Sequence, residues 1–455
     1  MGIAGSSRAP VNTMLINPAN MVDSRAFVDV NIVGFSVFAR NNLAYLNGRS
    51  FNFANAKNIQ MPEFNRANAP YSVHADVSLR GPSVVFAVRK HSFGLVTGFR
   101  SVTDVRGISK ELGFSITNGF LYKPMVGVTQ HVQKLRAASL NWLETGISYG
   151  TILSRRGDMI TEFGMTVKRL YGVAGVGVRL DDWTYQVSDS SDLETFNLTG
   201  EYAFNDPGTT NPSIVNGKGW GMDMGVMFKV RFKESSEYTP HNPCTDGDYR
   251  YRFGFSVLDV GAIKFKAPFY RNKFNQTEQN QWNDFNSVTV NDLNGVDSLL
   301  NVGLGVSKKT ADQSKFKMML PTGLSAQFDY NIGHGFYCYS MIMGGMPWRN
   351  RLGAQRASFL AVVPRWERKR FEVSVPISLY EFKSPQVGLM FRFSSFIVGS
   401  DNLGWLLFKQ NIYGADLYMS MKFTLYRHPK CHPKKSNPKV MKRIHTASPP
   451  PCPSW

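Results

Sequence analysis

Residues 222–232 read MDMGVMFKVRF, and their hydrophobic residues recur at every second position. Because successive side chains of a β-strand point to opposite faces, this segment predicts a strand with one apolar and one polar face. The apolar face consists of Met222, Met224, Val226, Phe228, Val230 and Phe232. The same alternation recurs in residues 249–257, 324–332, 371–379 and 387–393, so the predicted fold class is all-β.

Two architectures share this pattern. A soluble sandwich packs the apolar faces of two sheets against each other, whereas a membrane barrel turns them towards lipid and its polar faces towards the lumen. The alternating segments run about 9–15 residues, which suits a tilted strand that crosses a bilayer. Their apolar faces are rich in aromatic residues and their polar faces carry full charges. The sequence therefore favours a transmembrane antiparallel β-barrel of about 14 strands, with the sandwich as the alternative.

Charged side chains on the polar faces are the candidate lumen residues. In a dry core they would be costly without partners, whereas in a lumen they can be hydrated or paired. They are Asp223, Lys229, Arg231, Arg250, Arg252, Asp329, Glu372 and Arg392. They either form a network of salt bridges that plugs the barrel or line a polar path, and alternation alone does not separate these two interpretations.

Composition excludes several other classes of protein. The 455 residues include only 19% charged residues and 13% aromatic residues, and no uncharged apolar run approaches the length of a membrane helix. Four cysteines are too few for a disulfide scaffold. The net charge of +19 lies partly in residues 427–455, which carry Lys and Arg but no Asp or Glu. These figures exclude a helical membrane bundle, a collagen and a disordered chain.

The alternating segments divide the chain into three parts. Residues 1–25 are not strand-like, residues 26–426 form the barrel, and residues 427–455 are a basic, Pro-rich tail that we expect to be disordered. Within the barrel, residues 43–70 and 266–315 are expected to be long loops, and 108–136 a helical insert. A secretory signal is expected upstream of Met1, because no charged and apolar leader is present.

The patterns that carry chemistry are weak. His428, Cys431, His432 and Cys452 do not have zinc-site spacing, and residues 172–177 (GVAGVG) are expected to form a tight hairpin rather than a dinucleotide loop. The pair His334 and Ser340 is weak evidence for a nucleophile and its base. We therefore predict no catalytic residue, no cofactor, no metal site and no nucleic-acid partner.

Several motifs resemble a known family. They are Asn17, Pro18 and Ala19, followed by residues 144–153, 164–172, 219–225, 252–261, 363–376 and 388–402. The ordered set is similar to an uncharacterised family of Bacteroidota outer-membrane barrels, which is distantly similar to long-chain fatty-acid (FadL-like) transporters. The resemblance implies an outer-membrane location, about 14 strands, and an N-terminal segment, residues 1–25, folded inside the lumen as a hatch.

Two functions follow as hypotheses. The first is passive transport of a hydrophobic or amphipathic small molecule, carried over from the distant relatives, through a lateral opening at a strand disrupted by Pro376 or Pro385. The second is a plugged structural barrel that acts as a partner in a cell-envelope complex, with its long loops as docking surfaces. The expected partners are outer-membrane lipid and either a hydrophobic ligand or another envelope protein.

Overall fold

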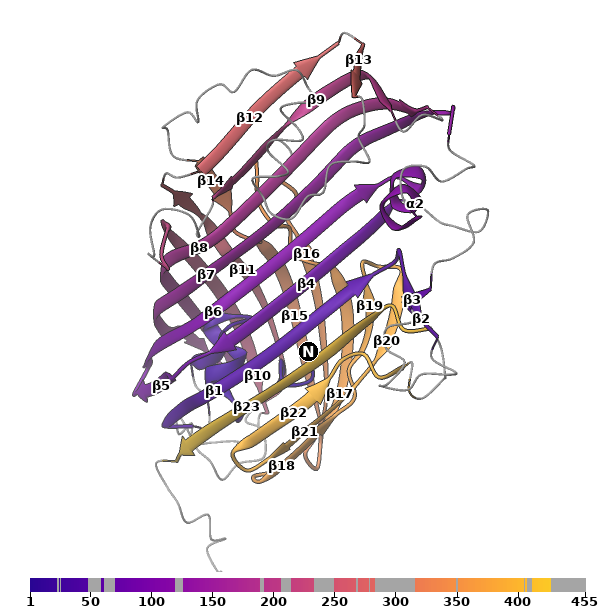
Figure 1. Cartoon of the computed structure of the whole chain (residues 1–455). Helices are drawn as coiled ribbons and strands as arrows, with labels where there is room; N and C mark the ends of the chain where they lie inside the picture. Colours follow the sequence, from indigo (N-terminus) through magenta and orange to yellow (C-terminus); the bar gives the residue numbers. More distant parts are fainter. Residues whose placement is uncertain are drawn as a thin grey trace, which may run out of the picture.

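The structure is a computed structural model, and it describes residues 1–22, 24, 26–47, 59–60, 70–118, 126–188, 192–205, 214–232, 249–266, 269–277, 279–282, 316–348, 351–404, 406 and 411–426. These residues form a closed antiparallel barrel of 14 strands (Figure 1). The predicted fold class is therefore confirmed. The predicted tail, residues 427–455, lies outside the described residues. No described helix is long and apolar enough to cross a membrane.

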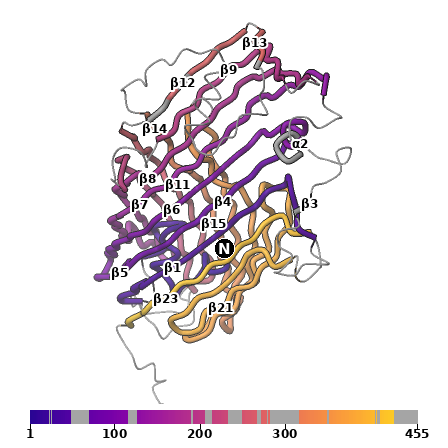
Figure 2. The backbone as a smooth tube through the Cα atoms, in the orientation of Figure 1, coloured from indigo at the N-terminus to yellow at the C-terminus, as the bar shows by residue number. Residues whose placement is uncertain are grey.

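The barrel strands follow one another around the wall in chain order, and several consist of two pieces. In the first half they are β1 (Val28–Asn41), β4 (Tyr71–Arg80) with β5 (Ser83–Val88), β6 (His91–Ile108), β7 (Thr129–Arg156), β8 (Met159–Val187), β10 (Gly217–Arg231) and β11 (Tyr249–Phe265). In the second half they are β14 (Phe316–Met319) with β15 (Gly323–Gly333), β16 (Phe336–Gly345), β17 (Phe359–Glu367), β18 (Phe371–Ser374) with β19 (Ile377–Tyr380), β20 (Ser384–Val387) with β21 (Leu389–Phe393), β22 (Phe396–Ser400) and β23 (Gly414–Leu425). Pairing of β1 with β23 closes the wall, so the indigo and yellow ends of the chain lie side by side (Figure 2).

The two ends of the barrel differ. At one end, which we call the turn end, tight turns join β5 to β6, β7 to β8 and β15 to β16. At the other, the loop end, longer connections carry the small strands β2 (Tyr45–Leu46) and β3 (Ile59–Gln60) and the helix α2 (Lys110–Asn118). The expected helical insert at 108–136 is therefore only partly present, because β7 already begins at Thr129 and continues the alternating pattern.

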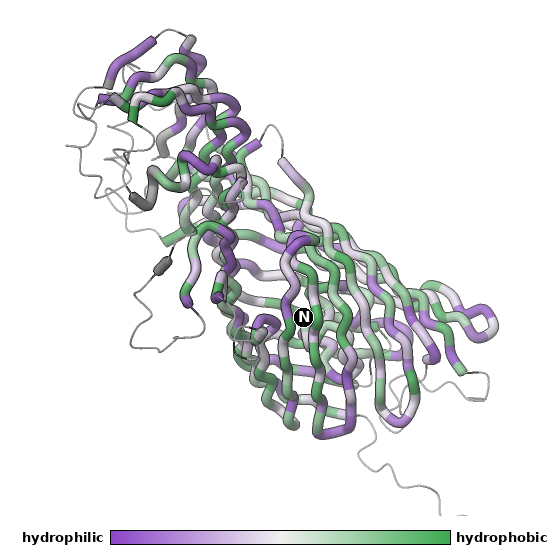
Figure 3. Tube along the Cα trace, turned by 90° about the vertical axis from the view of Figure 1, so that its right-hand side faces the viewer, coloured by the Kyte–Doolittle hydropathy of each residue, from purple (hydrophilic) through white to green (hydrophobic). Residues whose placement is uncertain are grey.

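The alternation places apolar side chains outside and polar ones inside. The described strands expose large hydrophobic residues such as Ile332, Phe393 and Phe423, whereas Asp329, Glu372 and Lys422 are buried. Figure 3 shows hydrophobic and hydrophilic residues alternating along the strands. A sandwich would bury the apolar faces instead, so this distribution excludes that alternative.

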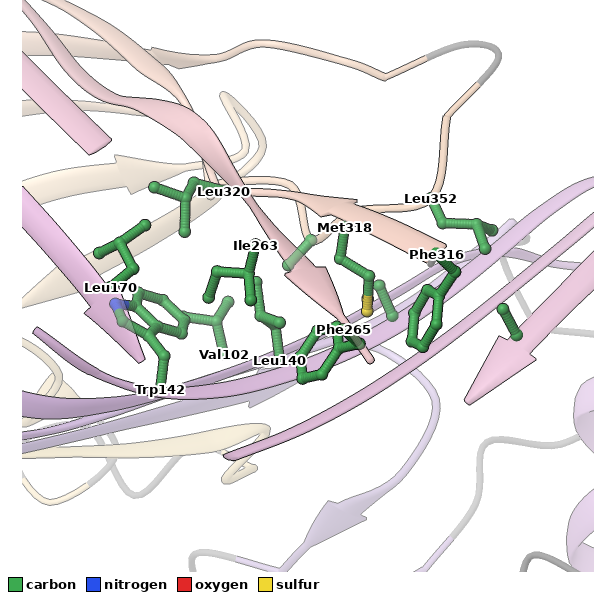
Figure 4. Close-up of a cluster of buried hydrophobic side chains, with 13 residues drawn as sticks. Val102, Leu140, Trp142, Leu170, Ile263, Phe265, Phe316, Met318, Leu320 and Leu352 are labelled. Carbon is green, nitrogen blue, oxygen red and sulfur yellow. The ribbon is translucent and has the colours of Figure 1, made fainter. Parts of the chain in front are cut away.

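Near the loop end the two walls touch through apolar side chains. Trp142, Leu170, Phe265, Phe316, Met318 and Leu352 belong to one buried cluster (Figure 4). Phe265 packs directly on Gly172 and Gly175, where a Cβ atom would overlap its ring. Residues 172–177 therefore lie inside β8, and the expected tight hairpin is wrong. Gly172, Gly217 and Phe265 follow one another in one row across β8, β10 and β11, and the glycines allow the Phe265 ring to fold closely over the neighbouring strands.

β7 and β8 extend beyond the barrel. The loop-end part of β8 pairs with β7 on one side and with β9 (Leu193–Asn205) on the other, and β9 in turn pairs with β12 (Phe269–Gln276) and β13 (Asn280–Trp282). The expected long loop at 266–315 thus contains two strands, and the alternation there was too short to reveal them. The resulting sheet projects from the loop end (Figure 1).

Candidate functional site

The N-terminal residues 1–22 lie against the inner faces of the barrel strands. They contain two short helices, α1 (Pro10–Thr13) and the 3₁₀ turn η1 (Pro18–Met21), and most of their side chains are buried. We call residues 1–22 the lumen segment. Its predicted role as a hatch stays a prediction.

Asn17, Pro18 and Ala19 form the tightest docking point of the lumen segment. Asn17 caps η1 by accepting a hydrogen bond from the Ala19 amide at 3.0 Å. Its Nδ2 atom donates to the carbonyl oxygens of Val226 and Phe255 at 3.3 and 3.4 Å. One side chain thus connects the segment to β10 and β11.

Glycines in the facing wall make room for this contact. A Cβ atom at Gly164 would overlap the backbone of Pro18 and Ala19, and one at Gly225 would overlap the Asn17 side chain. Gly150 faces Met21 and Val22 in the same way. These glycines belong to the motifs that carry the family resemblance. Residues 144–153, 164–172 and 219–225 therefore contribute to the surface on which the lumen segment docks.

Buried ion pairs surround the first residues of the lumen segment. Arg365 donates to both carboxylate oxygens of Asp329 at 2.9 Å, and Arg252 donates to the same carboxylate at 3.0 Å. Arg252 also donates to the carbonyl oxygen of Gly5 at 2.6 Å. The wall network therefore binds the segment directly as well as neutralising its own charges.

A second network lies on β18, β21 and β23. Arg392 donates to Glu372 at 2.8 Å, and Ser6 donates to the same carboxylate at 2.8 Å. Lys422 forms an ion pair with Asp29 at 3.0 Å and donates to the carbonyl oxygen of Arg8 at 2.6 Å. Neither Lys422 nor Asp29 was among the predicted residues, although Lys422 lies in a strictly alternating segment that would have placed it inside; the alternation of β1 is interrupted by the irregularity between Asn31 and Val33.

The structure brings most of the predicted lumen charges inside. Asp223, Lys229, Arg252, Asp329, Glu372 and Arg392 are buried. Arg231 is half-buried near the turn end, and Arg250 is exposed. A bulge between Val230 and Arg231 of β10 pairs Arg231 with Tyr249 and leaves Arg250 unpaired in the ladder, so the inward position passes to Tyr249.

A third charged cluster surrounds Asp259 in the middle of the barrel. Arg100 and Lys168 form ion pairs with it at 2.8 and 2.7 Å, and Arg356 is a further partner. Lys168 also pairs with Asp223 at 2.7 Å. A bulge in the β10–β11 ladder and a φ of 53° at Asp259 turn this side chain inward. A strict alternation does not predict such a turn, so the sequence did not single out Asp259.

A cavity of about 360 Å³ lies beside this cluster. Its charged lining includes Arg80, Arg100, Glu144 and Arg356, and its apolar inner lining is Ile3, Leu15, Ile16, Phe38, Phe359 and Tyr380. Leu15 and Ile16 belong to the lumen segment, which therefore forms part of the cavity wall. The lining of the space therefore combines charged and apolar side chains.

The same cavity is lined by residues from the outer face of the barrel. Phe35, Leu79, Phe99 and Met419 are paired in one row across β23, β1, β4 and β6 and occupy outward positions. On the inner side of the same strands Gly34, Arg80 and Gly98 also line it. The cavity therefore reaches through the wall at this level.

The wall is interrupted at this level by Gly81 and Pro82. β1 pairs with β4 up to Arg80 and with β5 from Ser83, so the two residues between them leave the ladder. Side chains replace the lost bonds: Asn31 donates to the Gly81 carbonyl at 3.2 Å, and Thr97 to the Pro82 carbonyl at 2.9 Å. Because proline cannot donate an N–H group, it marks the break.

The two prolines named from the sequence occupy other places. Pro376 separates β18 from β19, and its carbonyl accepts a hydrogen bond from Gly388 at 2.8 Å. Pro385 lies within β20 and faces Leu379. Neither residue lines the cavity. The Gly81–Pro82 pair was visible in the sequence as a turn signal inside a strand pattern, and this signal would have located the interruption.

Solved structures similar to this one include membrane channels. The Pseudomonas putida toluene transporter TodX is 9% identical over 92% of this chain and 95% of its own, with a TM-score of 0.41. The Ralstonia pickettii toluene transporter TbuX is 9% identical, covers 94% of this chain and 97% of its own, and has a TM-score of 0.38. A Pseudomonas aeruginosa FadL homologue is 10% identical, covers 92% and 96%, and has a TM-score of 0.39.

The sequence comparisons identify the family. No curated protein matches the chain. A family model matches residues 18–401, which is most of the chain. The resemblance to an uncharacterised family is therefore confirmed, while its restriction to Bacteroidota stays a prediction. The protein belongs to DUF5723, a family of unknown function.

Proposed function

We propose that the chain is an outer-membrane barrel that allows passive passage of a hydrophobic or amphipathic small molecule. The apolar outer face supports the location. On β10, outward apolar residues run from Trp220 to Val230, and at usual strand rise and tilt they cover about 25 Å of height, which is the thickness of a barrel's lipid-facing band.

The observation that carries the transport proposal is the cavity beside the interruption at Gly81 and Pro82, which Arg80 and Thr97 line. It joins the amphipathic space inside the barrel to outward residues that would face lipid. A molecule with an apolar body and a polar end fits its mixed lining. Exchange of ligand between the lumen and the membrane is the function that this geometry supports best.

A ring placed in the opening tests this proposal. Ser36 and Ser78 lie directly opposite each other on β1 and β4, and both line the cavity. We expect Ser36→Phe to reduce the uptake of the apolar fluorophore N-phenyl-1-naphthylamine by cells that express the chain. Ser340→Phe adds the same ring to β16, outside the cavity, and is expected to leave uptake unchanged. Equal uptake by the two variants would contradict the proposal.

A second candidate is the plugged structural barrel. It is favoured by the contact of Phe265 with Gly172 and Gly175 near the loop end, together with the docked lumen segment. In that case uptake by the wild-type chain would equal that of cells with an empty vector. A stable envelope partner would then be recovered by crosslinking in intact cells.

A further inference from the structure

A row of three lysines crosses the outer face near the loop end. Lys218 on β10 is paired with Lys264 on β11, and Lys264 is paired with Lys317 on β14. All three side chains are exposed. Like charges directly opposite each other on neighbouring strands destabilise a sheet, so this row is favourable only beside a negative counter-charge.

The described part of the chain does not supply that counter-charge. None of the ion pairs among the described residues includes these three lysines. Across two strand spacings the row is about 10 Å wide, which is wide enough for a group with more than one phosphate. The ligand chemistry that fits is therefore a polyvalent oxyanion.

The position of the row identifies where such an anion would lie. Trp220, which is 61% exposed, lies two residues from Lys218 on the same outward face and begins the apolar band. The Arg169 guanidinium lies 4.8 Å from the centre of the Trp220 ring. Tryptophans at the edge of the apolar band of a barrel mark the membrane interface. The lysines thus stand just outside the band, at the level of lipid headgroups.

A basic cavity continues the row towards the loop end. It has a volume of about 720 Å³ and is lined by Lys317, Arg179, Arg271, Lys273 and Arg351. Its carboxylates Asp181 and Glu201 are already paired: Arg271 contacts Glu201 at 2.6 Å, and Arg179 contacts Asp181 at 3.4 Å. Among the described residues, Lys273 and Arg351 take part in no such pair. The cavity therefore keeps an excess of positive charge.

We propose that Lys218, Lys264 and Lys317, with the adjoining cavity, bind the phosphorylated headgroup of a lipid in the leaflet at the loop end. This proposal rests on the proposed membrane location, but not on transport. Each lysine near an anionic membrane surface contributes about fivefold to binding, so the three together contribute about 100-fold.

The test uses the full chain in detergent micelles, with a bis-phosphorylated glycolipid as the probe and binding followed by native mass spectrometry. We expect the triple variant Lys218→Gln, Lys264→Gln, Lys317→Gln to bind about 100-fold more weakly than the wild type. The matched control removes three exposed cations at the turn end, through Lys90→Gln, Lys369→Gln and Arg370→Gln, and is expected to bind like the wild type.

Three results would overturn the proposal. The first is that the triple variant binds the glycolipid as tightly as the wild type. The second is that the control variant loses as much glycolipid affinity as the triple variant. The third is that inorganic phosphate binds as tightly as the glycolipid, which would identify a free solute as the ligand. The single variant Lys264→Gln, expected to bind about fivefold more weakly, serves if the triple variant does not fold. Uptake of the apolar fluorophore by the triple variant is expected to equal that of the wild type, so failure of this proposal is distinguishable from failure of the transport proposal.

Discussion

Gly164 lies where the barrel wall meets Asn17, Pro18 and Ala19, and a single methyl group at this position tests the docking of the lumen segment. A Cβ atom there would overlap backbone atoms of Pro18 and Ala19, which cannot move aside as a flexible side chain would. Gly164→Ala therefore forces the segment away from β8. Overpacking by one methyl group in a well-packed site costs about 1–3 kcal/mol.

This free-energy cost changes the equilibrium between the docked and the displaced lumen segment. If the methyl group destabilises only the docked state, the ratio of displaced to docked segment rises by about 5- to 150-fold. Amide hydrogen exchange of a peptide covering residues 10–22 measures that ratio, because exchange follows local opening. We expect exchange of this peptide to accelerate by the same factor in Gly164→Ala, with the exchange of the β15–β16 hairpin unchanged.

Gly344→Ala is the matched control. A Cβ atom at Gly344 on β16 meets nothing within 4 Å, so the same substitution there adds a methyl group without a clash. Exchange of residues 10–22 in this control is expected to equal that of the wild type. If Gly164→Ala and Gly344→Ala exchange at the same rate, the lumen segment is not held at Gly164, and the docking surface proposed above is wrong.

Three further outcomes are expected. Arg365→Met removes one partner of a buried ion pair and should lower the free energy of unfolding by about 3 kcal/mol, measured from the urea concentration at which half of the protein loses the folded, heat-modifiable gel band; adding Asp329→Leu should lower it further, because Arg252 then loses its carboxylate, and a full rescue would contradict the network described above. Phe265→Ala removes a ring from the buried apolar cluster near the loop end; it should cost about 3–5 kcal/mol and raise the conductance of planar bilayers, whereas unchanged conductance would show that this cluster does not close the lumen. Asn17→Ala should cost about 1–3 kcal/mol and accelerate exchange of residues 10–22, and normal exchange would show that the cap and its wall bonds are dispensable.

Alternation made the barrel predictable, because lipid and lumen impose opposite polarity on successive residues of every strand. It placed Asp223, Asp329 and Glu372 on the inner face, where the structure buries them. Alternation fails where a bulge inserts a residue. For this reason Arg250 is exposed and Asp259 turns inward, and a strict alternation at every second residue predicts neither orientation.

The alternation of hydrophobic and polar residues does not predict contacts between segments that lie far apart in the chain. The glycines at 164 and 225 looked like ordinary strand glycines, and only their contact with Pro18 and Asn17 explains them. The interruption at Gly81 and Pro82 was readable as a turn signal, but its position beside a cavity depends on Phe38 and Phe359, which come from β1 and β17. The local sequence therefore predicts the interruption of the strand, whereas only the tertiary structure shows that a cavity lies beside it.

The pairing of β1 with β23 bears on how the molecule assembles. These strands lie at opposite ends of the barrel sequence, so the wall can close only after the last strand has been synthesised. The lumen segment precedes β1 and contacts it through Val11 and Asp29, yet it also contacts β8, β10, β11 and β18. Such non-local contacts form late and make folding slow. Because these contacts need strands from several parts of the barrel, residues 1–22 are expected to dock only after much of the wall has formed.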